Sequence, residues 1–127
     1  MAQPQAVILD TNIVIELYKG NREVRNKCMD IGERLLYISE VTVAEFHFGA
    51  LNKKEIPIIK KHLNKFTWIP VNESISGTFV DLMTKYSLSH KPYLGDMLIA
   101  ATSLYFDIHL YTLNKKDFRF ISGLKLL

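Results

Sequence analysis

The sequence predicts an α/β domain with a central parallel sheet. Short apolar segments typical of buried strands alternate along the chain with longer segments that have helical periodicity. The first apolar segment, Ala6–Leu9, contains no polar residue, as expected of a strand that is covered on both faces. Because ligands of such sheets bind beyond the carboxyl ends of the strands, residues that directly follow a strand are the first candidates for a site.

The first 71 residues supply three of the expected strands. Ala6–Leu9 is followed by Asp10-Thr11-Asn12, residue types that favour helix N-termini, and then by a helix over Ile13–Lys19 that Gly20 ends. The elements expected next are a polar helix over Arg22–Ile31, a strand over Leu35–Ser39, helices over Val41–Leu51 and Glu55–Phe66, and a strand over Thr67–Val71.

The second half of the chain contains the most apolar helix, predicted over Leu94–Phe106, where Asp96 is the only charged residue. Before it, we expect a helix over Ser74–Tyr86 and a loop over Ser87–Tyr93. After it, we expect a strand over Ile108–Thr112 and a last edge strand over Gly123–Leu127.

Composition is that of an ordinary globular domain. The 127 residues are 48% hydrophobic and 23% charged, which excludes a disordered, collagen-like or coiled-coil chain and favours one domain over residues 1–127. No stretch approaches the ~20 apolar residues of a membrane span, and we expect no secretory signal. Cys28 is the one cysteine, which excludes an internal disulfide and a cysteine zinc cluster. These observations favour a cytoplasmic protein with no membrane partner.

Four carboxylates stand at positions that indicate a site. Asp10 directly follows the first strand, Asp96 is the one charge of an apolar helix, and Asp117 lies in the loop after Ile108–Thr112. Glu45 falls in a narrow strip between two apolar stripes of its helix, where a carboxylate is costly unless it is paired or bound to metal. Each has a structural alternative: Asp10 and Asp96 as helix N-caps, Glu45 as a partly exposed residue, and Asp117 as an ordinary loop residue.

The helix over Val41–Leu51 also predicts a covering partner. One apolar stripe consists of Val41, Ala44, Phe48 and Leu51, and a second stripe, on nearly the opposite face, consists of Val43, Phe46 and Ala50. A helix that is apolar on two faces is buried or covered, so without a partner we expect the second stripe to form an exposed patch.

Charge and ligand type indicate a divalent cation and a polyanionic partner. We expect the carboxyl groups of Asp10, Glu45 and Asp96 to converge within reach of one cation, with Asp117 close by, because like charges destabilise a fold unless a cation neutralises them. Oxygen ligands suit Mg²⁺ or Mn²⁺. The chain carries 16 Lys and Arg against 13 Asp and Glu, so its surface outside this acidic pocket is basic and attracts polyanions. Five lysines that flank one predicted helix form a solvated face that could also touch phosphates: Lys53, Lys54, Lys60, Lys61 and Lys65.

Four short blocks of sequence carry a family resemblance. The blocks are Leu9–Asn12, Ser39–Glu45, Asp96–Thr102 and Tyr111–Phe118. Taken together and in this order, they resemble the motifs of PIN-domain ribonucleases, most closely the VapC toxins of bacterial and archaeal toxin–antitoxin pairs. The resemblance covers nearly the whole chain.

The resemblance implies a three-layer α/β/α fold and Mg²⁺- or Mn²⁺-dependent endonuclease cleavage of RNA, often of a tRNA or an rRNA loop. It implies that Asp10 and Asp96 are the principal metal ligands, that Glu45 ligates through water or orients the attacking water, and that Asp117 completes the quartet. The residues implied to hold these carboxylates or a phosphate oxygen are Thr11, Asn12 and Asn114. The partners it implies are a second copy of the chain in a homodimer and a small antitoxin that blocks the pocket.

Two alternative functions belong to other classes. A phosphohydrolase of the haloacid-dehalogenase type also begins with a strand and an Asp, but it needs a second Asp two residues later, where this chain has Asn12. A catalytically inactive PIN-like module would bind RNA or a protein without cutting, and the four intact acids argue against it. A nuclease assay with and without Mn²⁺ separates these alternatives.

Overall fold

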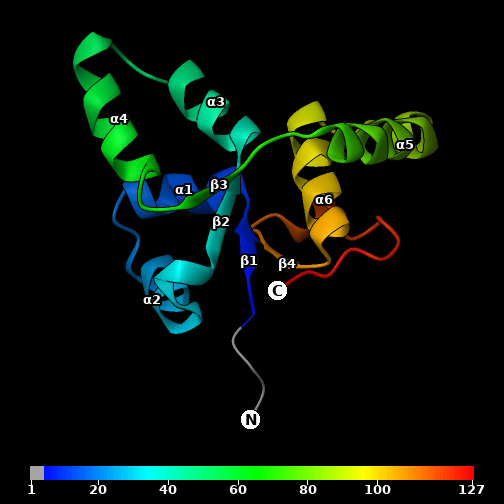
Figure 1. The fold of residues 1–127 in the computed structure, drawn as a ribbon, viewed down its shortest axis with the longest axis horizontal. Helices are drawn as coiled ribbons and strands as arrows, with labels where there is room; N and C mark the ends of the chain where they lie inside the picture. Colours follow the sequence, from blue (N-terminus) through cyan, green and yellow to red (C-terminus); the bar gives the residue numbers. More distant parts are fainter. Residues whose placement is uncertain (1–4) are drawn as a thin grey trace.

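The computed structural model describes residues 5–127, which form a four-stranded parallel sheet flanked by helices (Figure 1). The strands are β1 (Val7–Leu9), β2 (Leu36–Ser39), β3 (Thr67–Ile69) and β4 (His109–Tyr111), in the spatial order β3-β2-β1-β4. All three pairings are parallel, so the carboxyl ends of the strands share one edge of the sheet. The α/β class and the parallel sheet predicted from the sequence are confirmed.

Helices cover both faces of this sheet, which gives the three layers. They are α1 (Thr11–Tyr18), α2 (Arg22–Ile31), α3 (Glu40–Phe48), α4 (Ile56–Leu63), α5 (Glu73–His90) and α6 (Leu94–Phe106), with single 3₁₀ turns η1 (Glu33–Leu35), η2 (Lys53–Glu55) and η3 (Lys115–Asp117). Figure 1 shows α1 to α4 to the left of the sheet and α5 and α6 to its right.

The strands alternate between two cores, as the pleat requires. Val7 and Leu9 of β1 pack with buried residues of α1, α2 and α4, whereas Ile8 packs with buried residues of α5 and α6. Each strand of the middle of the sheet is therefore covered on both sides, which explains the uninterrupted apolar run of β1. Among the described residues, no helix is long and apolar enough to cross a membrane.

The prediction of a loop over Ser87–Tyr93 is wrong in its first part, because α5 continues to His90. Tyr86 is buried near the end of this helix, its ring lies 5.0 Å from that of Phe120, and its hydroxyl accepts a hydrogen bond from the Ser122 backbone. This packing holds another turn of helix, which ends where Lys91 adopts a left-handed conformation.

The predicted edge strand over Gly123–Leu127 is reduced to a single bridge. Leu126 pairs with Leu110 of β4, and Leu127 donates its backbone N–H to the Leu110 carbonyl. One bridge closes this edge of the sheet without forming a strand.

The exposed patch expected on α3 lies on the opposite face from the predicted one. Phe46 is buried, and Val43 and Ala50 pack against the core formed with α1, α2 and α4. It is Phe48 that remains uncovered, with 94% of its surface exposed, and Leu51 beyond the helix end is 85% exposed. Helical periodicity identifies the two stripes, but only the position of α4 decides which of them becomes core.

Candidate active site

Asp10 lies where the sequence places it, directly after β1 at the carboxyl edge of the sheet. Its Oδ1 accepts the backbone N–H of Thr11 at 2.7 Å, so it is the N-cap of α1. Its Oδ2 accepts the hydroxyl of Thr112 at 2.7 Å. The residue is only 5% exposed, and burial raises the pKa of this carboxyl group while the two hydrogen bonds lower it in part. Asp10 is therefore both the helix cap and a buried carboxylate of the site.

Glu45 reaches the same edge from α3. Its Oε1 accepts the Thr11 hydroxyl at 2.9 Å, and the Thr11 hydroxyl is also 2.9 Å from that of Thr42, which is fully buried. On the other side lies Gly95, where a Cβ atom would be 3.4 Å from Glu45 Oε1, in van der Waals contact with the carboxylate. Partial burial raises the pKa of Glu45, and the negative charge of Asp10 adds to the rise.

Asp96 is the most perturbed of the four acids. It lies in the first turn of α6, but Tyr93 is the N-cap residue of this helix and no side chain caps it. Burial raises the pKa of Asp96 to about 7, and repulsion from Asp10, Asp117 and Glu45 contributes. The alternative interpretation of Asp96 as a helix cap is therefore wrong, and all three other acids lie near enough to oppose its ionisation.

Asp117 completes the group from η3. Its Oδ2 accepts the side-chain N–H of Asn114 at 2.5 Å, which fixes it across the turn that follows β4. Its charge raises the pKa of both Asp10 and Asp96, so it belongs to the same electrostatic cluster. The four acids from four separate elements, Asp10, Glu45, Asp96 and Asp117, are called the carboxylate edge below.

The carboxylate edge is not a ready-made ligand set. Among residues 5–127, no group of three His, Cys, Asp or Glu side chains is positioned to hold a metal ion. In this arrangement Asp10 is held by Thr11 and Thr112, Glu45 by Thr11, and Asp117 by Asn114. The convergence expected from the sequence is thus found in the charges, but not in the carboxyl oxygens themselves. The donor chemistry nevertheless fits a hard divalent cation, which would relieve the repulsion centred on Asp96.

Sequence reasoning missed two threonines of the site. Thr112 is 3% exposed; it donates to Asp10 and accepts the backbone N–H of Asn114 at 3.0 Å and the side-chain N–H of Asn12 at 3.4 Å. Asn12 therefore supports Asp10 through Thr112, and its own Oδ1 accepts the backbone N–H of Leu113 at 3.3 Å. The one available signal for Thr112 is that it follows β4 as Asp10 follows β1. The available signal for Thr42 is that it shares the narrow strip of its helix with Glu45, three residues later.

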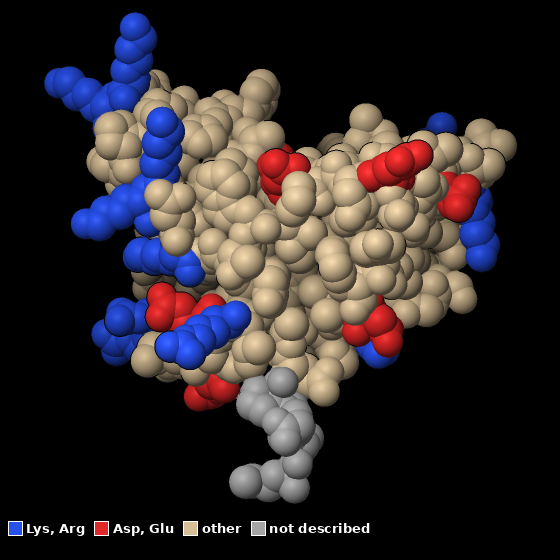
Figure 2. All heavy atoms as spheres, in the orientation of Figure 1, with Lys and Arg blue, Asp and Glu red and all other residues tan. Residues whose placement is uncertain are grey.

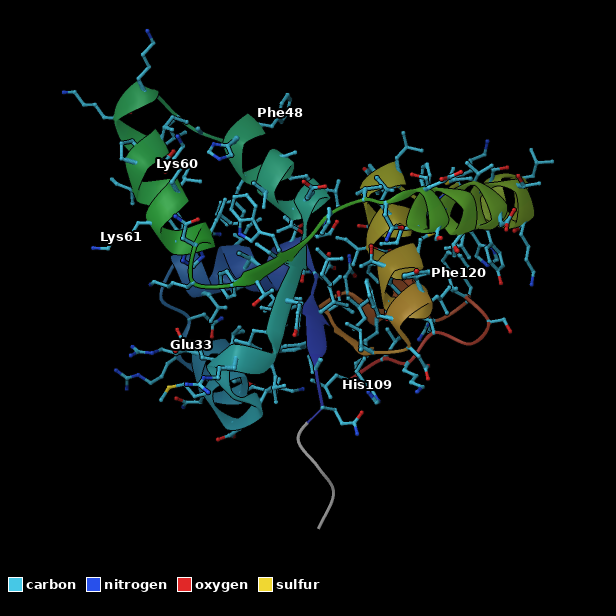
Figure 3. All side chains as sticks on the ribbon, viewed as in Figure 1. Glu33, Phe48, Lys60, Lys61, His109 and Phe120 are labelled. Atoms are coloured by element: carbon cyan, nitrogen blue, oxygen red, sulfur yellow. The ribbon has the colours of Figure 1, made fainter. Side chains whose placement is uncertain are left out.

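An apolar cleft of about 360 Å³ opens beside the carboxylate edge. Thr11 and Glu45 line one end, and Glu55 and Ile59 line the end next to α4. Its walls are largely apolar and aromatic: Ile15, Tyr18, Phe46 and Phe48. In Figure 3, Phe48 stands at the outer end of α3, away from the sheet. A larger cleft of about 450 Å³ lies between α2 and α4 and contains none of the four acids.

Comparison with known proteins gives consistent matches. A family model described as PIN domain matches residues 7–123. Ribonuclease VapC10 of Mycobacterium tuberculosis is 31% identical over 121 residues, 94% of this chain and 90% of that protein. Ribonuclease VapC1 of Rickettsia felis is 31% identical over 129 residues, 95% of this chain and 94% of that protein. Among solved structures, a toxin–antitoxin complex from Klebsiella pneumoniae contains a chain with a TM-score of 0.77 and 29% identity, covering 94% of this chain and 95% of that one.

Proposed function

Because the chain belongs to the PIN domain family, we propose that it is a metal-dependent endoribonuclease that hydrolyses phosphodiester bonds of RNA. The observation that carries the proposal is the carboxylate edge, in which four acids from distant parts of the chain meet where parallel sheets bind ligands. The relatives named ribonuclease and the toxin–antitoxin complex support its role as the toxin of such a pair.

We assign the metal to Mg²⁺ or Mn²⁺, held principally by Asp10 and Asp96, with Glu45 and Asp117 completing the set. A divalent ion bound there supplies charge neutralisation at the scissile phosphate and acidifies water. The chain's own residues prepare this site: Thr112 and the Thr11 backbone orient Asp10, and the Thr11 hydroxyl orients Glu45. Asp96 is half-buried with a pKa of about 7, so its carboxyl group exchanges a proton near neutral pH and yields that proton when a cation takes its place.

A cleavage assay with a matched aspartate pair tests this function. Purified chain is incubated with a mixture of tRNA and rRNA in chelator, in Mg²⁺ and in Mn²⁺, and the cut ends are sequenced. We expect cleavage only with metal and a loss of more than about 100-fold in Asp96→Asn, because even residues behind the ligands of a metal site contribute 10–100-fold. Asp107→Asn is the control, since Asp107 lies just beyond the other end of α6 and pairs with Lys125 at 2.9 Å. Cleavage in chelator, or equal activity in the two variants, would contradict the proposal.

The partner we propose is a small antitoxin whose apolar segment lies in the cleft beside Glu45. The support is the lining of this cleft by exposed Phe48 and by Ile15, and its position against Thr11 and Glu45, which an occupant would cover. We expect the product of the adjacent gene to co-purify with the chain and to stop cleavage, and Phe48→Ser to weaken both effects. If the antitoxin inhibited wild type and Phe48→Ser equally, its binding site would lie elsewhere.

We also propose a homodimer. Tyr93 and Leu94, at the start of α6, are 80% and 61% exposed, and this apolar rim lies next to Asp96 in the first turn of the helix. A second copy that covered part of this rim would remove it from water. Light scattering on the purified chain is expected to give twice the monomer mass of 14.7 kDa, and a monomer at micromolar concentration would contradict the dimer.

A further inference from the structure

One segment of the molecule, from η2 to just beyond the end of α4, carries five lysines. Lys53 and Lys54 in η2, Lys60 and Lys61 in α4, and Lys65 just beyond it are all exposed, and we call these five residues the lysine face. In Figure 3, Lys60 and Lys61 extend outward from α4. Residues 53–65 contain these five lysines and a single acid, Glu55, whereas the entire chain has a net charge of only +3. The positive charge of the protein is therefore concentrated here.

The lysine face has no acidic partners within the described chain. The ion pairs of residues 5–127 are Lys19 with Glu16 and Lys125 with Asp107, and neither involves this face. Glu55 is engaged elsewhere, since it accepts the Tyr18 hydroxyl at 3.0 Å and the Leu51 backbone N–H at 2.8 Å. Figure 2 shows the contrast: only blue side chains project at the upper left, over η2 and α4, whereas blue and red are mixed lower down, over α2.

Helix stability does not explain the whole face. Lys60 and Lys61 occupy the last turn of α4, where positive charge is favourable to the helix dipole. Lys53 and Lys54 directly precede the same helix, and positive charge at a helix N-terminus is unfavourable. Helix stability therefore does not account for Lys53 and Lys54, whereas a negatively charged ligand outside the chain would.

An exposed indole lies at the Lys65 end of this face. Trp68 of β3 is 42% exposed, and its Nε1 donates a hydrogen bond to the Leu63 carbonyl at 2.9 Å, which fixes the ring against the end of α4. A fixed, exposed aromatic ring beside lysines can stack on an unpaired base, and stacking of this kind is indifferent to base identity. This combination of amines and a flat ring favours a nucleic acid over an acidic protein.

Helix α4 links the lysine face to the carboxylate edge. The apolar cleft that begins at Thr11 and Glu45 reaches Ile59 of α4, and Lys60 and Lys61 lie on the same helix. An RNA long enough to extend across α4 can therefore contact both surfaces.

We infer that the lysine face, with Trp68 at its end, is a second contact surface for the sugar-phosphate backbone of the RNA substrate, outside the carboxylate edge. This inference rests on the proposed function. It makes tight binding depend on RNA long enough to lie on both surfaces at once. The lysines act on binding of long RNA and not on the bond that is cut.

Binding of two RNA lengths tests the inference. In an Asp96→Asn background that does not cut, fluorescence anisotropy measures the affinity for a labelled stem-loop RNA and for a hexanucleotide. For Lys60→Gln/Lys61→Gln we expect a loss of about fivefold or more with the stem-loop, and a decrease of about 1.5 in the slope of log K against log salt, near one phosphate contact per lysine. The loss with the hexanucleotide is expected to stay below twofold.

The matched control is Lys85→Gln/Lys91→Gln, which removes the same charge from the end of α5, on the opposite side of the sheet in Figure 1. Equal losses in both double variants would reduce the effect to net charge and overturn the inference, as would an unchanged stem-loop affinity. Binding of labelled poly-glutamate is measured in the same way. If Lys60→Gln/Lys61→Gln weakened poly-glutamate binding as much as stem-loop binding, the face would be assigned to an acidic protein instead. If the wild type cuts RNA and the lysine variant binds the stem-loop normally, only this inference is overturned. If the wild type neither binds nor cuts RNA, the proposed function is overturned too.

Discussion

The carboxylate edge and the lysine face are both clusters of one sign of charge, but they are built in opposite ways. The acids come from residues 10 to 117 and meet only in the folded chain, whereas the lysines lie within residues 53–65 and would be neighbours in any conformation. The acids are partly withdrawn from water and raise one another's pKa, whereas the lysines project into solvent, where salt screens them. Folding therefore stores electrostatic strain at the first cluster and almost none at the second.

The largest expected effect is stabilisation of the carboxylate edge by metal. A ligand that binds only the folded state adds about 2.7 kcal/mol at a hundredfold excess over its Kd, so thermal unfolding in Mn²⁺ is expected at a clearly higher temperature than in chelator. Asp96→Asn should be more stable than wild type in chelator and should lose most of the rise with Mn²⁺. Removal of Lys60 and Lys61 should leave the rise intact, and a midpoint insensitive to metal in wild type would contradict a cation site at this edge.

The next effect concerns the buried hydroxyl that holds Asp10. In Thr112→Val the Oδ2 atom of Asp10 loses its donor while remaining buried, which is expected to cost about 1–3 kcal/mol of unfolding free energy. RNA cleavage should fall about 10–100-fold, as for other residues that orient metal ligands. Urea unfolding and cleavage rates measure the two losses.

Thr84→Val is the control for this prediction, because the Thr84 hydroxyl is exposed on α5 and donates only to the Val80 carbonyl. If Thr112→Val behaved like Thr84→Val, then Asp10 would not depend on its hydrogen bond for position.

A pH titration of stability should distinguish the carboxylate edge from every other charged region. The folded-state pKa of Asp96 is raised to about 7 from an ordinary value of 3.8, so the folded chain binds this proton more tightly than the unfolded chain. Stability from this group is present below pH 4 and is lost as the pH rises through about 7. The melting temperature of metal-free Asp96→Asn, minus that of wild type, should therefore increase from pH 4 to pH 7.5. A constant difference would show that folding does not raise the pKa of Asp96.

The smallest expected effect separates the two ends of the lysine face. Lys53→Gln/Lys54→Gln removes positive charge ahead of α4 and is expected to raise the unfolding free energy by a few tenths of a kcal/mol at low salt, whereas Lys60→Gln/Lys61→Gln should lower it by a similar amount. Paired urea titrations at low and high salt measure both, and the differences should vanish at high salt. Effects of the same sign would remove the dipole argument for an external ligand.

The positions of the acids could be predicted because each depends on a local pattern. Asp10 follows an apolar strand, Asp117 follows the last strand by a few residues, and Asp96 is the single charge of its helix. Parallel strands place such positions at one edge of the sheet whatever the other side chains are. Helical periodicity also singles out Glu45, which falls between the two apolar stripes of its helix.

The hydrogen bonds around the acids could not be predicted, since they depend on how helices settle against one another. Thr42 reaches Thr11 only because α3 packs against α1, and Gly95 lies against Glu45 only because α6 begins there. The same limit applies to α3, where the choice of buried stripe depends on α4, and to the last turn of α5, which depends on Phe120.

The chain of hydroxyls behind Glu45 has a direction. An ionised Glu45 can only accept, so the single hydrogen of the Thr11 hydroxyl points to it and the hydroxyl of Thr42 must point to Thr11. If Glu45 takes up a proton and donates it to Thr11, the Thr11 hydroxyl is released to turn and donate to Thr42. The orientation of a fully buried threonine is thereby tied to the charge on a carboxylate at the surface. The direction of the hydrogen bond between Thr11 and Thr42 is thus coupled to the protonation state of Glu45.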